Sequence, residues 1–267
     1  MGRQGDRNHR WRILFLASLP FILFLLIPLL ALLARVSFRD LIDAVADPQA
    51  GQAITLSLVT TLVTTGIAVL AGTPLAYLLS RKKFHGHTFL DTLIDLPLIL
   101  PPSVAGVALL VAFGRRGVLG PFFSAIHLDI AFTQIAVVLA QLFVSAPYYI
   151  KSAAAGFSAV DRDLEQAAAI DGASPVKTFW TVTMPLAFPA VIGGAVMTWA
   201  RALGEFGATI IFAGNFPGKT QTMPLAIYMG FEIDMKIALV LAFLLLIVSF
   251  SILLIVKGIF RNKFSVF

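Results

Sequence analysis

Long apolar runs separated by short polar segments dominate this chain, and six of them approach the roughly 20 residues that a helix needs to cross a bilayer. These runs cover residues 13–34, 53–80, 90–113, 132–150, 188–212 and 236–256. The pattern therefore predicts an all-α integral membrane protein with six transmembrane helices. Pro97, Pro101 and Pro102 interrupt the third run. We expect that helix to have either a simple packing kink or a break that protein or a water-filled cavity covers.

The first apolar run follows a basic segment, as the apolar core of a secretory signal peptide also does. Such a core has only about 7–15 residues, whereas the run 13–34 is long enough to span the membrane. An Ala-x-Ala sequence at 44–46 lies well beyond that run. We therefore expect the first helix to remain part of the protein.

One polar segment between two spans carries the start and stop signals of two short helices. Residues 161–185 read DRDLEQAAAIDGASPVKTFWTVTMP. Asp161 is suited to cap the first helix, and Gly172 sits where that helix would end in a left-handed turn. Ser174 can cap a second helix. Pro175 is suited to the first position of that helix, because its missing N–H would have no partner there. Such a unit can enter a groove on another protein, although an ordinary amphipathic connector would look the same.

Composition supports the membrane assignment. Hydrophobic residues make up 58% of the chain and charged residues 13%, about half the charged share of a typical soluble domain. The mean hydropathy is +0.91. The sequence has no cysteine, which excludes disulfides, thiolate metal sites and thiol nucleophiles. His85 and His87 form a lone His-x-His in a basic loop, which is far more typical of a solvated turn than of a metal site.

The distribution of charge predicts the orientation. The formal net charge is +6, and basic residues favour the cytoplasmic side of a membrane. Placing the N-terminus in the cytoplasm puts most of the 20 Lys and Arg residues inside. Six spans then put both termini and the segment 161–185 in the cytoplasm.

Two charges fall inside the fifth predicted span. At ~1.5 Å per residue, Arg201 lies about 20 Å along that span, near mid-membrane, and Glu205 is four residues later. The pair faces protein or water, because a charge facing lipid would cost at least ~2.5 kcal/mol. Arg201 either offsets the charge of a passing anion or only pairs with Glu205 to hold the bundle. No further titratable groups for a proton relay, and no paired carboxylates at membrane depth, are expected.

The segment 161–185 resembles the coupling motif of ATP-binding-cassette (ABC) importer permeases, which reads Glu-Ala-Ala, three residues, Gly, nine residues, Ile, one residue, Leu-Pro. The matching positions are Ala167, Ala168, Gly172, Val182, Met184 and Pro185. Gln166 stands where the motif has Glu, and Glu165 precedes it. The resemblance implies that the residues coupling the chain to an ATPase are Asp163, Leu164, Glu165, Gln166, Ala167, Ala168, Gly172 and Pro185.

A second stretch resembles the molybdate permease branch of this family. Residues 201–228 read RALGEFGATIIFAGNFPGKTQTMPLAIY, and the pieces 204–209, 212–215 and 220–228 carry the likeness. Sulfate permeases share the first two pieces. The resemblance implies a permease for molybdate or tungstate, with a sulfate or thiosulfate permease as the alternative. Because a pathway for a dianion needs only weak donors, we expect the pathway candidates to be Arg201, Glu205, Thr209 and Ser103.

The resemblance further implies the type I importer permease fold and a bacterial or archaeal inner-membrane location. Its expected partners are a second copy of the chain, two ABC ATPase subunits and a periplasmic or lipid-anchored oxyanion-binding protein, with no nucleic acid. ATP and Mg²⁺ would bind the ATPase, because the chain has no phosphate-binding Gly-x-x-x-x-Gly-Lys-[Ser/Thr] loop. The chain itself is expected to bind no cofactor or metal and to have no catalytic residue. The expected divisions are 1–50, a permease core at 51–260 and a cytoplasmic tail at 261–267.

Two rival classes remain. A secondary transporter would need an inverted repeat, and the sequence has no convincing internal repeat. A membrane enzyme would need a catalytic motif such as Gly-x-Ser-x-Gly or His-Glu-x-x-His, and the sequence has neither.

Overall fold

The computed structural model describes residues 3–263, which form helices and no strand. The elements are α1 (Arg3–Arg35), α2 (Phe38–Ala46), α3 (Pro48–Arg81), α4 (His87–Ile99), α5 (Pro102–Phe113), α6 (Gly120–Ala125), α7 (Gln134–Ala159), α8 (Arg162–Ile170), α9 (Pro175–Thr178), the π-helical turn η1 (Phe179–Thr183), α10 (Met184–Leu203), α11 (Gly207–Phe212), α12 (Met223–Ile233) and α13 (Met235–Lys263). Five helical segments are long and apolar enough to span a membrane, and the bent pair α4–α5 would make a sixth. The predicted all-α membrane architecture is therefore confirmed. Residues 264–267 of the predicted tail lie outside the described part.

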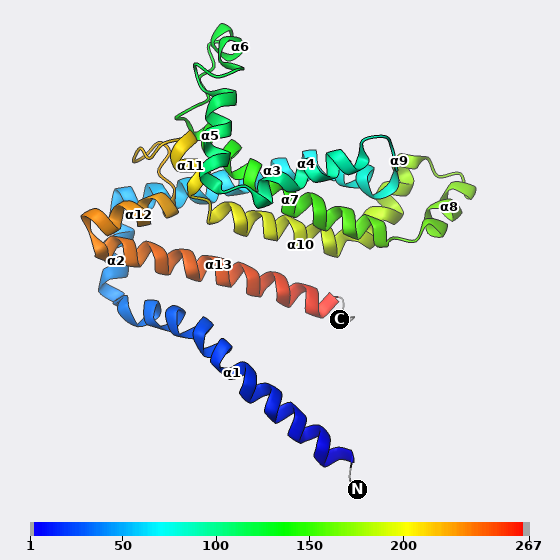
Figure 1. The fold of residues 1–267 in the computed structure, drawn as a ribbon, viewed down its shortest axis with the longest axis horizontal. Helices are drawn as coiled ribbons and strands as arrows, with labels where there is room; N and C mark the ends of the chain where they lie inside the picture. Colours follow the sequence, from blue (N-terminus) through cyan, green and yellow to red (C-terminus); the bar gives the residue numbers. More distant parts are fainter. Residues whose placement is uncertain (1–2, 264–267) are drawn as a thin grey trace.

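Three long helices, α3, α7 and α10, form the centre of the fold, and α7 packs against both of the others (Figure 1). Small residues let the helices approach closely. Ala136, Ala140 and Ala153 of α7 are fully buried, and a Cβ added to Gly156 would collide with the Cβ of Ala190. Small residues at helix contacts are typical of membrane bundles, because lipid provides no hydrophobic force to drive helices together.

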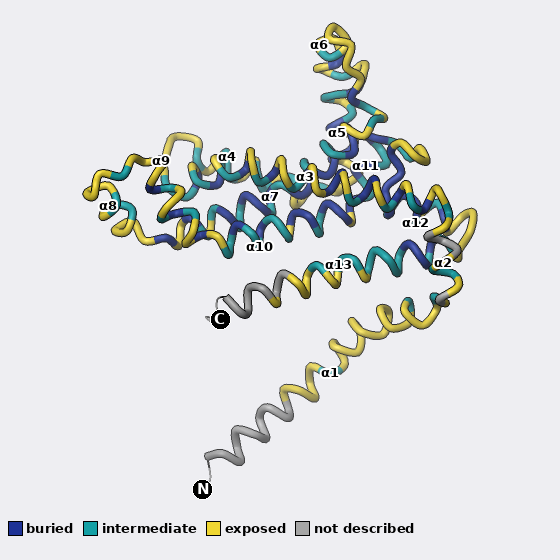
Figure 2. Tube along the Cα trace, turned by 180° about the vertical axis from the view of Figure 1, so that it is seen from behind, coloured by how far each residue is buried: buried dark blue, intermediate teal, exposed yellow. Residues whose placement is uncertain are grey.

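The outer helices lie on two opposite sides of this centre. α13 and α1 lie on one side, and α4 lies on the other, where α5 and α6 project away from the bundle (Figure 1). The described part of α1 is almost entirely exposed (Figure 2). Its side chains are nearly all apolar from 14 to 34, so lipid or another protein can cover them.

The third apolar run is broken rather than kinked. α4 and α5 meet at 116°, and Leu100 and Pro101 between them have extended backbone. The two prolines cause the break, because Pro101 and Pro102 lack an N–H and each disfavours helical backbone in the residue before it. Of the two expected alternatives, the structure therefore shows the broken helix.

The fifth run differs from its predicted bounds at both ends. Its helix begins at Pro175, passes through the π-helical turn η1 and ends at Leu203. Residues 204–206 then separate α10 from α11. The prediction of one continuous span over 188–212 was wrong at this break. The second and fourth helices are longer than predicted, because polar residues at their ends continue the helical turns.

Candidate functional site

Local signals in the segment 161–185 form the predicted helix and corner. The Asp161 carboxylate caps α8 by accepting a hydrogen bond from the Asp163 N–H at 3.0 Å. Gly172 has φ of +83°, a left-handed conformation that glycine adopts without the strain of a Cβ. The Ser174 hydroxyl accepts a hydrogen bond from the Lys177 N–H at 3.3 Å. The caps and the glycine corner are thus confirmed.

The second helix of this segment is not a separate unit. α9, η1 and α10 follow one another without a break, so the helix leads directly into the membrane. Phe179 packs edge-on against Tyr77 and also contacts Phe157, whereas Trp180 is 62% exposed. Adjacent residues point in different directions on a helix, so Phe179 packs inward while Trp180 lies on the surface, and the two rings contact each other edge to face.

The α8 helix presents an uncovered surface. None of its residues is buried. Leu164 is 49% exposed and Ile170 86% exposed, and Gln166 and Ala167 are also on the surface. The other predicted coupling residues lie close by, with Asp163, Gly172 and Pro185 exposed and Ala168 half-buried. Apolar side chains exposed in this way on a polar helix are suited to contact another protein.

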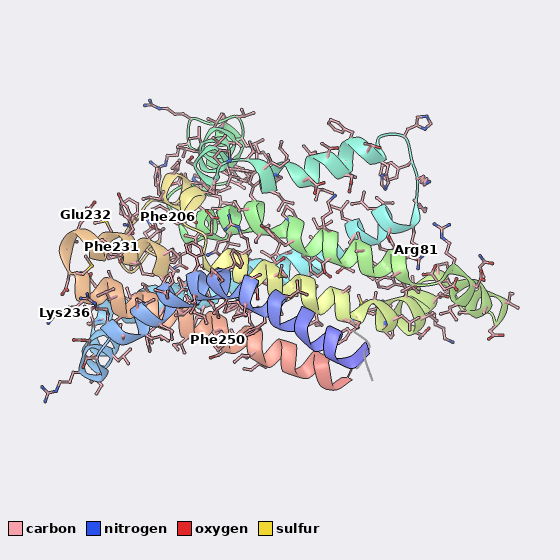
Figure 3. All side chains as sticks on the ribbon, turned by 60° about the horizontal axis from the view of Figure 1, so that its bottom comes forward. Arg81, Phe206, Phe231, Glu232, Lys236 and Phe250 are labelled. Carbon is pink, nitrogen blue, oxygen red and sulfur yellow. The ribbon has the colours of Figure 1, made fainter. Side chains whose placement is uncertain are left out.

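Glu165 instead turns toward the body of the chain. Its Oε1 accepts hydrogen bonds from the Arg81 guanidinium at 2.8 Å and the Thr183 hydroxyl at 2.6 Å. The Arg81 Nη2 also donates to the Val160 carbonyl at 3.1 Å. Figure 3 shows Arg81 at the end of the molecule where α8 lies. These contacts tie α8 to the end of α3 and to the turn before α10, while Gln166 remains available to a partner.

Arg201 and Glu205 form an ion pair where α10 ends. Arg201 Nη1 lies 2.8 Å from Glu205 Oε2, and the two side chains are 27% and 1% exposed. The other oxygen of Glu205 accepts a hydrogen bond from the Ala208 N–H at 2.8 Å. Glu205 therefore neutralises Arg201 and satisfies one free N–H at the start of α11. The predicted pairing is confirmed, although Glu205 lies after the end of α10.

The remaining pathway candidates lie at the same junction but differ in exposure. Ser103, in the first turn of α5, is exposed, whereas Thr209 of α11 is fully buried and its hydroxyl has no hydrogen-bond partner. A Cβ added to Gly207 would lie 2.8 Å from the Pro102 Cβ and 3.4 Å from the Ser103 N. The break between α4 and α5 therefore packs directly against the break between α10 and α11.

A third charged cluster brings together two carboxylates of the predicted third span, a pairing that was not expected. Lys151 of α7 lies 2.7 Å from an Asp91 oxygen and 2.8 Å from an Asp95 oxygen, both on α4. The two aspartates are four residues apart within the predicted third span, which was a sufficient signal. Lys151 was assigned to a loop because the fourth helix was expected to end at residue 150. That helix continues to Ala159, which places Lys151 beside α4.

The chain is similar to components of known transport systems. A family model described as "Binding-protein-dependent transport system inner membrane component" matches residues 68–262. The "Molybdenum transport system permease protein ModB" of Mycobacterium tuberculosis is 41% identical over 245 residues, which cover 92% of each chain. A "Probable sulfate transport system permease protein cysT" of Chlorokybus atmophyticus is 36% identical over 230 residues, covering 85% of this chain and 79% of that protein.

A solved structure has the same fold. The chain superposes on a bacterial ABC transporter "involved in the import of the acidic polysaccharide alginate" with a TM-score of 0.76 and 17% sequence identity. The superposition covers 98% of this chain and 99% of that chain. The arrangement of helices is therefore the same as in that chain of the ABC transporter.

Proposed function

This chain belongs to the family of binding-protein-dependent transport system inner membrane components, and on that premise we propose that it is the membrane subunit of an ATP-driven importer of molybdate. Tungstate, a tetrahedral dianion of the same shape, would use the same pathway. The observation that carries the proposal is the 41% identity to the molybdenum permease over 92% of both chains. Of the stretches that resemble that branch, residues 220–228, at the start of α12, are the ones that sulfate permeases do not share.

The proposed importer contains two copies of this chain, with the pathway between them, and two ATPase subunits. The exposed face of α8 supports ATPase docking, and Glu165 would transmit the movement of α8 to α3 and α10. An oxyanion-binding protein would deliver the substrate on the outer side, with both termini of this chain in the cytoplasm. ATP and Mg²⁺ would act on the ATPase subunits alone. Nucleotide would shift the equilibrium between inward-open and outward-open states by binding them with different affinities.

The pathway needs only weak contacts with the anion, because tight binding would prevent release. Arg201 is 27% exposed and already paired with Glu205, so its attraction for an anion is reduced. Ser103 is exposed beside the free N–H groups of the first turn of α5, which favour anions. The buried Thr209 would need a change of conformation before it could contact substrate. Selectivity would then lie mainly in the binding protein.

Sulfate is the second candidate substrate. The 36% identity to a sulfate permease over 85% of this chain supports it, and sulfate is also a tetrahedral dianion. The family relationship and the coupling helix are the same under both assignments, so only a substrate measurement separates them.

Elemental mass spectrometry of whole cells tests the substrate. Strains with and without the chain are grown in trace molybdate, with excess molybdate and limiting sulfate as controls. We expect cell molybdenum to fall without the chain and to recover at high molybdate, with growth on sulfate unchanged. Unchanged molybdenum with failed growth on limiting sulfate would transfer the assignment to sulfate. No change in either would favour another anion, a redundant route or a secondary transporter.

Gly172→Asp tests the coupling. A Cβ at Gly172 meets no atom within 4 Å, so the cost arises from the φ of +83°. We expect the corner after α8 to change shape, so that molybdenum uptake is lost while the chain still inserts and assembles. Normal uptake by this variant would contradict a role of the corner in coupling.

A further inference from the structure

The cluster of Asp91, Asp95 and Lys151 has no role in the function proposed above. Both carboxylates contact the same ammonium group, at 2.7 and 2.8 Å. With both aspartates ionised, the cluster carries one net negative charge. The side chains are not enclosed, since Asp91 is 41%, Asp95 37% and Lys151 33% exposed. The negative charge of the cluster therefore affects ions in the medium beside this part of α4.

The cluster lies near the inner boundary of the membrane. Lys151 follows the first residue of α7 by 17 positions, which corresponds to about 26 Å at 1.5 Å per residue. The hydrocarbon core is about 30 Å thick. The cytoplasmic assignment of α8 makes the end of α7 the inner end. An anion moving inward would pass this depth last.

The surface of α4 cannot face lipid along its whole length. Among the described residues, α4 has none that is buried, and its long-range packing is mainly against α7. At its far end, Pro101, Pro102 and Ser103 are exposed at a break in the helix. Broken backbone at membrane depth is tolerated only beside protein or water. The apolar helices α1 and α13 lie on the opposite side of the bundle (Figure 1), and because of the broken backbone we assign the α4 side to the pathway.

We propose that Asp91, Asp95 and Lys151 form an acidic exit for the oxyanion at the inner end of the pathway. This inference rests on the proposed function. The two carboxylates cancel the charge of Lys151, so this lysine does not retain the anion before it leaves. The excess negative charge lowers the local concentration of anions, because charges of the same sign repel each other. Cytoplasmic anions are thereby kept from re-entering the inward-open cavity.

The experiment compares two double variants that differ in net charge. Asp91→Asn with Asp95→Asn leaves Lys151 alone, with a net charge of +1. Asp91→Asn with Lys151→Gln leaves Asp95 alone, which preserves the wild-type net charge of −1 and removes the same ion pairs. Each is measured in the complete importer, purified with its ATPase and reconstituted in proteoliposomes. Binding protein and molybdate are outside, and ATP and increasing molybdate are inside.

We expect internal molybdate to inhibit uptake by the +1 variant at concentrations roughly tenfold lower than for wild type, from the attraction between a dianion and the altered charge. The −1 variant should respond to internal molybdate as wild type does. Asp91→Asn alone, with net charge zero and one ion pair intact, should be intermediate and covers the case in which a double variant fails to assemble. Equal sensitivity of all variants, or equal loss of uptake by both double variants, would overturn the proposal in favour of a purely structural ion pair.

Failure of the substrate assignment gives a different result. If wild type imports sulfate but not molybdate, the same series with internal sulfate decides whether the exit exists. If wild type imports no oxyanion, both the proposed function and the acidic exit are wrong.

Discussion

Two arginine–glutamate pairs in this chain have the same 2.8 Å separation but join different parts of the fold. Arg81 and Glu165 are 84 residues apart and join α3 to α8. Arg201 and Glu205 are four residues apart and lie across the end of α10. In Figure 3, Arg81 and Phe206, the neighbour of Glu205, lie in opposite halves of the molecule.

The difference in environment predicts different energetic roles. Glu205 is 1% exposed and its partner 27%, so removal of either group leaves a charge that water solvates poorly. Glu165 is 18% and Arg81 10% exposed, so this pair is also shielded from water, but Arg81 keeps the Val160 carbonyl as a partner when Glu165 is lost. The Arg201 pair should therefore mainly stabilise the break, whereas the Arg81 pair should mainly transmit movement.

Glu205→Ala should give the largest loss of stability in this comparison. It leaves Arg201 without its counter-charge and the Ala208 N–H without an acceptor, and breaking a buried pair in this way costs about 3 kcal/mol or more. The free energy of unfolding of the purified chain in detergent measures the effect.

Glu205→Gln and a double Arg201→Gln/Glu205→Gln variant separate the two contributions. The amide oxygen of Gln can still accept from Ala208, so Glu205→Gln should lose less than Glu205→Ala. The double variant has no uncompensated charge and should be more stable than Glu205→Gln. If all three variants unfold together with wild type, the pair does not stabilise the break, and Arg201 is then free to act on the anion.

Gly207→Ala tests the junction of the two broken helices and should have an intermediate effect. Its Cβ would lie 2.8 Å from the Pro102 Cβ, and overpacking of this kind costs about 1–3 kcal/mol. Gly193→Ala is the matched control, because that Cβ meets nothing within 4 Å and should stabilise α10 by roughly 0.5–1 kcal/mol. The thermal unfolding temperature should fall for Gly207→Ala and rise for Gly193→Ala. A rise for both variants would show that the two breaks move apart readily.

Local sequence signals predicted the α8 end of the molecule better than the broken end. The caps at Asp161 and Ser174 and the corner at Gly172 depend on residues within a few positions of each other, and each formed as expected. The contact between Gly207 and Pro102 joins residues more than 100 positions apart. Neither residue reveals the other, so a break after Leu203 could not be recognised from the apolar run alone.

Among the charged residues, some could be recognised from sequence, whereas their partners in the fold could not. Asp91 and Asp95 could have been recognised from sequence, because two aspartates one helical turn apart inside an apolar run are rarely placed there without a partner. Their partner, Lys151, depended on the length of α7, which hydropathy underestimates when a helix continues into small and polar residues. The link from Glu165 to Arg81 and Thr183 could not have been predicted, since it requires knowing how α8 docks.

A comparison of Glu165→Ala with Gln166→Ala should give the smallest change in stability. It also tests which of the two side chains contacts the ATPase. Loss of the Arg81 and Thr183 contacts should lower the free energy of unfolding by about 1–2 kcal/mol, because Arg81 is only 10% exposed but keeps its hydrogen bond to the Val160 carbonyl. Gln166→Ala should leave the free energy of unfolding unchanged, since that side chain is exposed.

The two variants should also differ in the assembled importer. Glu165→Ala should keep ATPase binding but lose the link between ATP hydrolysis and uptake, whereas Gln166→Ala should weaken ATPase binding itself. The reverse assignment would mean that Glu165 leaves Arg81 to contact the ATPase, and the pair would then be a switch rather than a fixed connection.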